Sequence, residues 1–311
     1  MTRGDLGRHG LRTRRRAAPQ TKHILSTNEL HPGWSIENFY RKFLWLPAAF
    51  IGVFFVGPII AVAVRSFFDP APGFGNYAEV LFSGIYLQVI WNTLGTALIV
   101  TFLCLLIAYP LAYVMAKAKG SMLAVMTSIV VVSLWTSVVI RSYAWMVIFQ
   151  RRGVLNNLLT STGLTDGAIN FLPGAIAVNV GMVHIMLPFM VLPILSNMRS
   201  IDTSLLTAAS VMGANPWLSF YKVFLPLSFP GISAGSALVF MMSLGFFVTP
   251  ALLGGPRHLM VAVLIEQQAN RMLNWGMESA LATVLLLSTV VLYLLYLRVV
   301  RYAGGGAQYG R

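Results

Sequence analysis

The chain has 311 residues, of which 57% are hydrophobic and 10% are charged. Soluble domains carry about a quarter charged residues, so this composition excludes a soluble globular protein. The formal net charge of +13 would suit a nucleic-acid-binding protein, but its distribution along the chain indicates membrane topology instead, and we expect no nucleic-acid partner. The single cysteine, Cys104, lies in an apolar run and cannot form an internal disulfide.

Residues 1–42 are polar and basic, and they show no regular apolar period, which predicts a disordered tail. A signal peptide is not expected, because the apolar run that follows is long and no small-x-small cleavage site closes it. Arginines cluster at positions 12–16. We interpret this cluster as a solvated segment that fixes orientation, with a lipid-headgroup or partner contact as the alternative.

Six apolar runs are long enough to cross a bilayer, which takes about 20 helical residues. The sequence therefore predicts an all-α integral membrane protein with about six transmembrane helices, followed by a short tail over 301–311. Prolines inside several runs predict kinked helices. The runs are 43–64, 91–116, 122–145, 174–197, 231–251 and 279–300.

The basic residues set the expected orientation. Placing the N-terminus in the cytoplasm puts most of the 22 lysines and arginines on the cytoplasmic side. Both termini and residues 199–231 then face the cytoplasm. The connections 65–90, 146–173 and 252–278 lie on the outer side, where they are candidate landing surfaces for an extracytoplasmic partner; plain connection is the alternative.

Residues 199–231, here called the elbow, lie between two apolar runs but are not simply apolar. Asp202 or Thr203 can cap a first short helix through a side-chain oxygen. Gly213 can end that helix in the left-handed conformation that glycine adopts at little cost. The pattern predicts the first half of a helix–turn–helix at a membrane surface.

A second helix is predicted directly afterwards. Asn215 is an N-cap residue type, and Pro216 occupies the first helical position, where no N–H is missed. Pro226 and Pro230 are expected to stop this helix and to turn the chain back toward the next apolar run.

The first helix of the elbow has small residues between larger apolar ones. Leu205, Ala209 and Met212 fall on one face at helical spacing, with Ala208 beside them. Another protein can approach such a face closely. The elbow is therefore a candidate docking site, and an amphipathic linker resting in the lipid headgroups is the alternative.

The elbow resembles the signature loop of ABC-type importer permeases. In that family the loop reads Glu-Ala-Ala, three residues, Gly, and then a run that ends in a hydrophobic residue and Pro; here Thr207 replaces the glutamate. The resemblance implies a coupling helix that docks in a groove of a cytoplasmic ATPase subunit. The implied docking residues are Thr207, Ala208, Ala209, Gly213, Asn215, Pro216, Leu225 and Pro226.

Three further stretches, 140–145, 153–156 and 230–255, resemble the spermidine/putrescine-type branch of these permeases. The resemblance implies import of a polyamine such as spermidine or putrescine, or a related small polar solute, by alternating access. It also implies separate ATP-binding ATPase subunits, a second permease subunit and an extracytoplasmic solute-binding protein in a bacterial inner membrane. The sequence alone leaves a homodimer open.

No set of residues indicates covalent chemistry. No His/Cys/Asp cluster has metal-ligand spacing, and no glycine-rich loop ends in GK[ST]. We therefore expect no enzyme activity, no metal and no cofactor in this chain, and we expect a partner subunit to use the ATP.

Polar groups at membrane depth are costly and are therefore functional candidates. Arg141 lies near the outer end of the third run, beside Tyr143 and Trp145, and is interpreted as a gate or a charge that lines the substrate path. An arginine anchored at the interface is the alternative. Asn179 and His184 lie in the fourth run, where a hydrogen-bonded packing role is the alternative.

Phe246 and Phe247 are candidates for an apolar constriction of the path, with core packing as the alternative. None of the six runs contains Asp or Glu, although a path for a cation is expected to carry acidic groups or aromatic faces. Either the binding protein and a second permease supply selectivity, or the cargo is not a polyamine.

Three rival functions are weaker. An ion-coupled secondary transporter usually has an internal repeat and a buried coupling carboxylate, and the sequence shows neither. A membrane-embedded enzyme would need clustered catalytic residues. A membrane scaffold would not need an elbow with so many capping, glycine and proline residues at its helix ends.

Overall fold

The computed structural model describes residues 36–304. Most of the predicted basic tail, including the arginine cluster, lies outside the described residues, and so do residues 305–311. All regular elements in the described part are helices, which confirms the predicted all-α class. The chain divides into two compact units, residues 1–58 and 59–311.

The described part of the first unit is one helical stretch. It consists of α1 (Ile36–Ile51) and the π-helical turn η1 (Gly52–Val56), with Pro47 inside α1. From Phe43 onward the residues of α1 and η1 are all apolar. A helix that is apolar on every side suits an environment of lipid or protein along its whole length.

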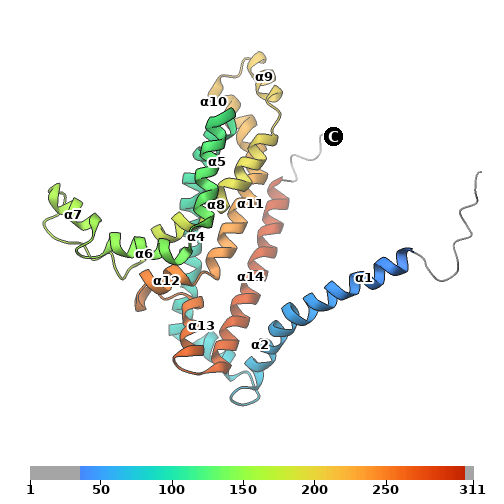
Figure 1. Cartoon of the computed structure of the whole chain (residues 1–311), viewed down its shortest axis with the longest axis vertical. Coiled ribbons are helices and arrows are strands. Elements are labelled where there is room, and N and C mark those ends of the chain that lie inside the picture. Colours follow the sequence, from blue (N-terminus) through green and yellow to red (C-terminus); the bar gives the residue numbers. More distant parts are fainter. Residues whose placement is uncertain (1–35, 305–311) are drawn as a thin grey trace, which may run out of the picture. The chain divides into compact units, whose positions relative to one another are not determined.

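The second unit holds the remaining helices, which Figure 1 follows from blue to red. α4, α8, α11 and α14 are its long helices, and the shorter ones connect them. In chain order the elements are α2 (Gly57–Phe68), α3 (Gly75–Phe82), α4 (Gly84–Lys117), α5 (Gly120–Trp135), α6 (Val138–Phe149), α7 (Val154–Ser161), α8 (Ala175–Ser200), α9 (Ser204–Val211), α10 (Pro216–Ser219), η2 (Phe220–Phe224), α11 (Leu225–Leu244), α12 (Val248–Leu253), η3 (Pro256–His258), α13 (Val261–Asn270) and α14 (Trp275–Gly304).

Five helical stretches of the described chain are long and apolar enough to cross a membrane, and a bent pair makes up to six. Five to six spans agree with the predicted all-α membrane protein of about six transmembrane helices. The five are Phe43–Phe68, Gly84–Lys117, Ala175–Ser200, Pro216–Leu244 and Trp275–Val300, and the bent pair is Gly120–Trp135 with Val138–Ser161.

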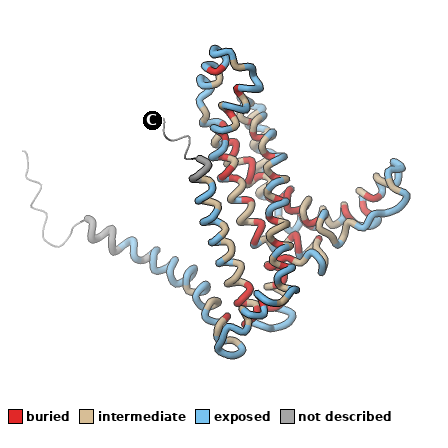
Figure 2. Tube along the Cα trace, turned by 180° about the vertical axis from the view of Figure 1, so that it is seen from behind, coloured by how far each residue is buried: buried red, intermediate tan, exposed pale blue. Residues whose placement is uncertain are grey.

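The core lies where α4, α8 and α11 pack together, and buried residues follow these helices through the bundle (Figure 2). Gly231 and Gly235 bring α11 close to α8. A Cβ added at Gly235 would lie 2.9 Å from the sulfur of Met190, and one at Gly231 would lie 2.6 Å from Cβ of Asn197. Small residues four apart are a common device for close packing of membrane helices.

The predicted run 122–145 is not one helix. α5 ends at Trp135, α6 begins at Val138, and the two directions differ by 94°. Thr136 and Ser137 have extended ψ angles of 133° and 132°, which interrupt the helical hydrogen bonding. Hydropathy does not detect such a break, because the flanking residues on both sides are equally apolar.

The prediction that Pro226 and Pro230 stop a helix is wrong. α10, η2 and α11 form one stretch from Pro216 to Leu244, which includes both prolines. In the π-helical turn the N–H of Leu225 bonds to the carbonyl of Phe220, five residues back. A π-helical turn just before a proline provides room for its ring, and so the helix continues.

Candidate functional site

The turn between the two elbow helices has the predicted chemistry. Gly213 has φ +87°, the left-handed conformation expected after α9. Asn215 is the N-cap of α10, and its Oδ1 accepts a hydrogen bond from the N–H of Leu218 at 2.7 Å. Pro216 follows at the start of the helix. These local predictions are confirmed.

The start of α9 is held by Asp202 rather than by Thr203. Oδ1 of Asp202 accepts from the N–H of Ser204 at 2.8 Å, whereas Thr203 makes no side-chain cap. Hydrogen bonds from the side chain and backbone of Ser204 lower the pKa of Asp202 below its ordinary value. The carboxylate therefore stays charged at neutral pH at the beginning of the coupling segment.

The exposed face of the elbow differs from the predicted one. Ala209 is buried, with 5% of its surface exposed, and its carbonyl accepts from the N–H of Ala214. Ala208 and Thr207 are exposed. Ala209 therefore packs inside the elbow instead of offering a docking face, because the turn at Gly213 folds the second helix back over it.

Large apolar side chains are exposed at the tip of the elbow. Val211, Met212 and Trp217 have 83%, 81% and 76% of their surfaces exposed, and Leu205 and Tyr221 are also exposed. Grouped exposed apolar residues commonly mark a surface that another protein covers.

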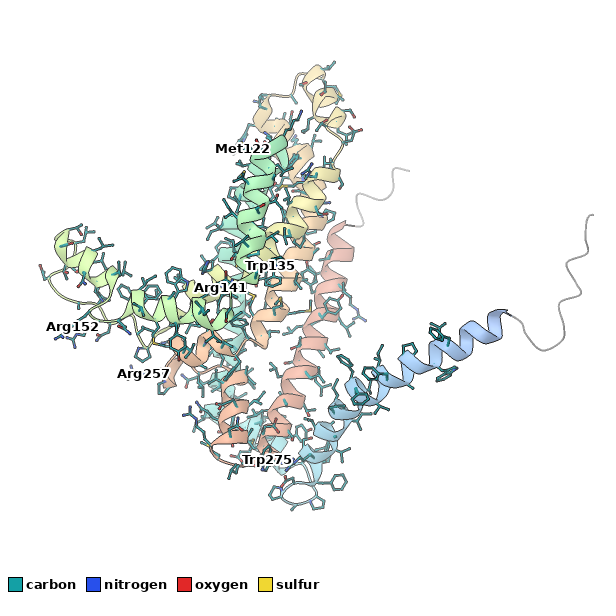
Figure 3. The ribbon with its side chains drawn as sticks, viewed as in Figure 1. Met122, Trp135, Arg141, Arg152, Arg257 and Trp275 are labelled. Atoms are coloured by element: carbon teal, nitrogen blue, oxygen red, sulfur yellow. The ribbon has the colours of Figure 1, made fainter. Side chains whose placement is uncertain are left out.

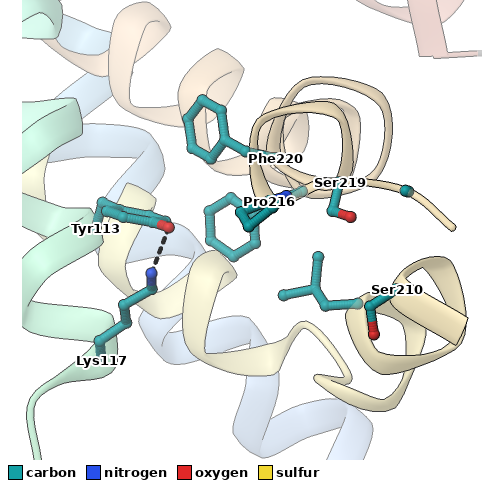
Figure 4. A pocket seen from close by; sticks show the side chains of 9 residues that line it. Tyr113, Lys117, Ser210, Pro216, Ser219 and Phe220 are labelled. Atoms are coloured by element: carbon teal, nitrogen blue, oxygen red, sulfur yellow. Dashed lines mark hydrogen bonds between the residues drawn. The ribbon is translucent and has the colours of Figure 1, made fainter.

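A pocket of about 290 Å³ lies between the elbow and the end of α4 (Figure 4). There Lys117 donates a hydrogen bond to the hydroxyl of Tyr113. The ring of Tyr113 packs edge-on against Phe220 and Phe224, with centroids 5.4 and 5.2 Å apart. The pocket is lined by Tyr113, Lys117, Leu206, Ser210, Ala214, Pro216, Ser219, Phe220 and Phe224.

The elbow is joined directly to two membrane helices. Its second helix continues into α11, so Leu225 and Pro226 lie in the shaft of that helix and not at the exposed tip. The hydroxyls of Tyr109 on α4 and Ser228 on α11 lie 3.1 Å apart and form a hydrogen bond. The elbow region is therefore linked to α4 and α11 by aromatic and hydrogen-bonded contacts.

A second candidate region, here called the Arg141 cluster, joins α6, α8 and α12. It consists of Arg141, Ser142, Trp145, His184 and Thr249 (Figure 3 labels Arg141). The hydroxyls of Ser142 and Thr249 form a buried hydrogen bond at 2.8 Å. The indole N–H of Trp145 donates to Nδ1 of His184 at 3.1 Å.

Gly181 explains why these three helices approach so closely. A Cβ at this position would lie 2.8 Å from Cγ2 of Thr249 and 2.9 Å from Cδ1 of Leu253. Thr249 lies in the predicted apolar run 231–251. Its pairing with Ser142 was missed, because the two are 107 residues apart and no local pattern connects them.

Arg141 itself is buried in the protein, with 7% of its surface exposed. Its Nε and Nη1 atoms have no hydrogen-bond partner within the described chain. This environment does not fit the alternative of an arginine that reaches out to the membrane interface.

The other candidates for the substrate path do not converge on one place. Tyr143 is exposed and lies away from the buried side of α6, and Asn179 is half-buried with Oδ1 unpartnered within the described residues. Phe246 packs against the main core, whereas Phe247 is exposed at the start of α12. The structure thus connects Arg141, Trp145 and His184 but not the full predicted set.

The family model and the relatives that match this chain are all membrane components of transport systems. The family model "Binding-protein-dependent transport system inner membrane component" matches residues 104–304. The spermidine/putrescine transport system permease protein PotB of Haemophilus influenzae is 38% identical over 72% of this chain and 78% of its own length. PotB of Escherichia coli K12 is 33% identical over 73% of this chain and 82% of its own length.

A solved structure has a similar fold. It is a bacterial alginate ABC transporter in complex with a periplasmic protein that holds an alginate pentasaccharide. One of its chains superposes with a TM-score of 0.69 at 20% identity, covering 86% of this chain and 96% of that chain. At this identity the likeness concerns the fold alone.

Proposed function

This chain belongs to the family of inner membrane components of binding-protein-dependent transport systems, and we propose that it imports a small polar organic solute of the polyamine type. It is the transmembrane permease of an ABC importer. The spermidine/putrescine names of its relatives support the polyamine class. Within the described membrane-spanning stretches the acidic residues are limited to Glu278, in the first turn of α14, which supports selectivity for a cation that comes largely from other subunits.

The observation that carries the proposed mechanism is the continuous helix from Pro216 to Leu244, which begins in the exposed elbow and ends inside the bundle. We propose that separate cytoplasmic ATPase subunits bind the apolar tip around Met212 and Trp217. ATP-driven closure of those subunits pushes the elbow, and the push passes into α11 and α4. The bundle then alternates between inward-facing and outward-facing states.

The remaining partners follow from the same proposal. A second, related permease subunit lies beside this one, and a solute-binding protein delivers cargo to the outer connections. Both termini lie in the cytoplasm, as the excess of basic residues on that side favours. ATP is bound by the partner subunits, and this chain needs no cofactor of its own.

The test is purification of the assembled complex from detergent extract. The wild-type chain is expected to bring down an ATPase subunit, a second permease and cargo-stimulated ATPase activity. Ala208→Glu places a charge on the exposed face of α9 and should reduce ATPase co-purification and uptake about tenfold or more.

Ala208→Ser is the matched control, because it keeps a small uncharged side chain at the same place. Ala209→Glu is a poorer test, since Ala209 is buried and a charge there would disrupt the elbow itself. If Ala208→Glu keeps full co-purification and uptake, the elbow is not the docking surface.

A further inference from the structure

Among the charged side chains of the described residues, Arg141 is the one with buried nitrogen atoms that lack a hydrogen-bond partner. More than nine-tenths of its surface is buried, and two of its three nitrogens lack any partner among the residues described. Its neighbours do not share this state: Ser142 bonds to Thr249, and Trp145 bonds to His184. The polar side chains next to Arg141 on α6 therefore have partners within the described chain, whereas its guanidinium does not.

Within residues 36–304, no carboxylate pairs with this guanidinium. The ion pair found in the described residues, between Arg65 and Asp69, lies elsewhere. The acidic side chains described lie in α3, α13, α14 and connecting segments, and none of them bonds to Arg141. A buried positive charge is strongly unfavourable unless an anion pairs with it.

The neighbouring ring adds a further donor. Because Trp145 donates to Nδ1 of His184, the neutral imidazole carries its proton on Nε2. Trp145 lies one helical turn after Arg141 on the same face of α6. The cluster thus presents donors from Arg141 and His184, and a group that accepts hydrogen bonds and carries negative charge is its chemical complement.

We propose that Arg141 is a binding site for a carboxylate that comes from outside this chain. A carboxylate accepts strong charge-assisted hydrogen bonds from a guanidinium, and the Nε and Nη1 donors of Arg141 have no partner among the described residues. The carboxylate is borne either by the transported solute or by a side chain of the adjacent permease subunit. The inference rests on the importer role in the proposed function and not on its polyamine class, since both sources exist only in an assembled importer and a polyamine carries no carboxylate.

One experiment separates the two sources by chemical capture. The Arg141→Lys variant, purified as the full complex, keeps the positive charge and adds a nucleophilic amine. Treatment with dicyclohexylcarbodiimide, which enters membrane-embedded sites, joins this amine to a touching carboxylate as an amide. Mass spectrometry then shows whether the amide partner is a peptide of the second permease.

A second measurement examines the solute. Putrescine and 4-aminobutyrate both have four carbons, but 4-aminobutyrate has a carboxylate in place of one terminal aminomethyl group. If the solute supplies the carboxylate, Arg141→Met should lower the ratio of 4-aminobutyrate uptake to putrescine uptake about tenfold. If the second permease supplies it, the cross-link forms, and Arg141→Met lowers the melting temperature of the complex without any added solute.

The proposal is overturned if the Arg141→Lys complex gives no cross-linked peptide and Arg141→Met lowers uptake of 4-aminobutyrate no more than uptake of putrescine. Gel filtration of both variants confirms that they are assembled before either result is read. Failure of the proposed function would appear differently, because the wild-type chain would then bring down no ATPase subunit at all.

Discussion

The elbow and the Arg141 cluster are incomplete in opposite ways. In the elbow the helix ends are capped by Asp202 and Asn215 within the chain, whereas the apolar side chains at the tip are exposed. In the Arg141 cluster the apolar surfaces are packed, and the charge is left without a partner. The first region therefore calls for an apolar partner surface, and the second calls for an anion.

The two regions also differ in how they connect to the bundle. The elbow acts on α4 and α11 through a continuous helix and the aromatic contacts of Tyr113. In the Arg141 cluster, α6 makes one side-chain hydrogen bond to α8 and one to α12, beside the close packing of α8 on α12 at Gly181. α8 packs against α11, and so it is the element that connects the two regions in the structure. The predictions below test this difference between the elbow and the Arg141 cluster.

The largest expected effect is at the elbow turn. Gly213→Pro cannot adopt φ +87° and removes the N–H that bonds to Ser210, so the two elbow helices should lose their arrangement. We expect uptake and ATPase co-purification to be lost, measured on the purified complex. Gly213→Asn is the control, because asparagine tolerates the left-handed conformation; equal loss in both variants would contradict the backbone explanation.

The second largest effect is expected where α11 packs against α8, between the elbow and the Arg141 cluster. Gly235→Leu forces a side chain against the sulfur of Met190 and should separate α11 from α8. Overpacking of this kind costs about 1–3 kcal/mol. The melting temperature of the complex should fall, and ATP hydrolysis should become partly independent of cargo.

Gly245→Ala is the matched control, since no atom lies within 4 Å of a Cβ added there. Should Gly235→Leu keep the coupling of hydrolysis to cargo, the packing of α8 on α11 would not be the connection between the regions.

A moderate effect is expected in the Arg141 cluster. Thr249→Val keeps the shape of the side chain but removes the hydrogen bond to Ser142, and a bond of this kind contributes about 1 kcal/mol. Thermal unfolding of the complex measures the change. Combining it with Ser142→Ala should cost little more than either variant alone; additive losses would mean that the two hydroxyls do not act as a pair.

The smallest effect concerns pH. The pKa of Asp202 is lower in the folded chain than its ordinary value of 3.8, so its contribution to stability is present above that value and is lost as pH falls through the folded pKa. Limited proteolysis of the elbow should therefore accelerate at acid pH in the wild type. Asp202→Asn should weaken this dependence, whereas an unchanged pH profile would assign it to other groups.

Sequence reasoning succeeded where structure depends on neighbours along the chain. Most of the apolar runs, the glycine at position 213 and the Asn215–Pro216 start were predicted correctly, because hydropathy, a positive φ and an N-cap are properties of a few consecutive residues. The helical class and the membrane setting follow from the same local properties, and the signature of the elbow indicated the family.

Tertiary structure decided the rest. Pro226 and Pro230 stay inside a helix because a π-helical turn accommodates them, and α5 and α6 separate at an extended Thr136–Ser137 step. Ala209 is buried because the following helix folds over it, and Arg141 is unpaired because no described acidic residue reaches it. Such outcomes depend on groups far apart in the chain, and their energies are set only when folding brings those groups to one place.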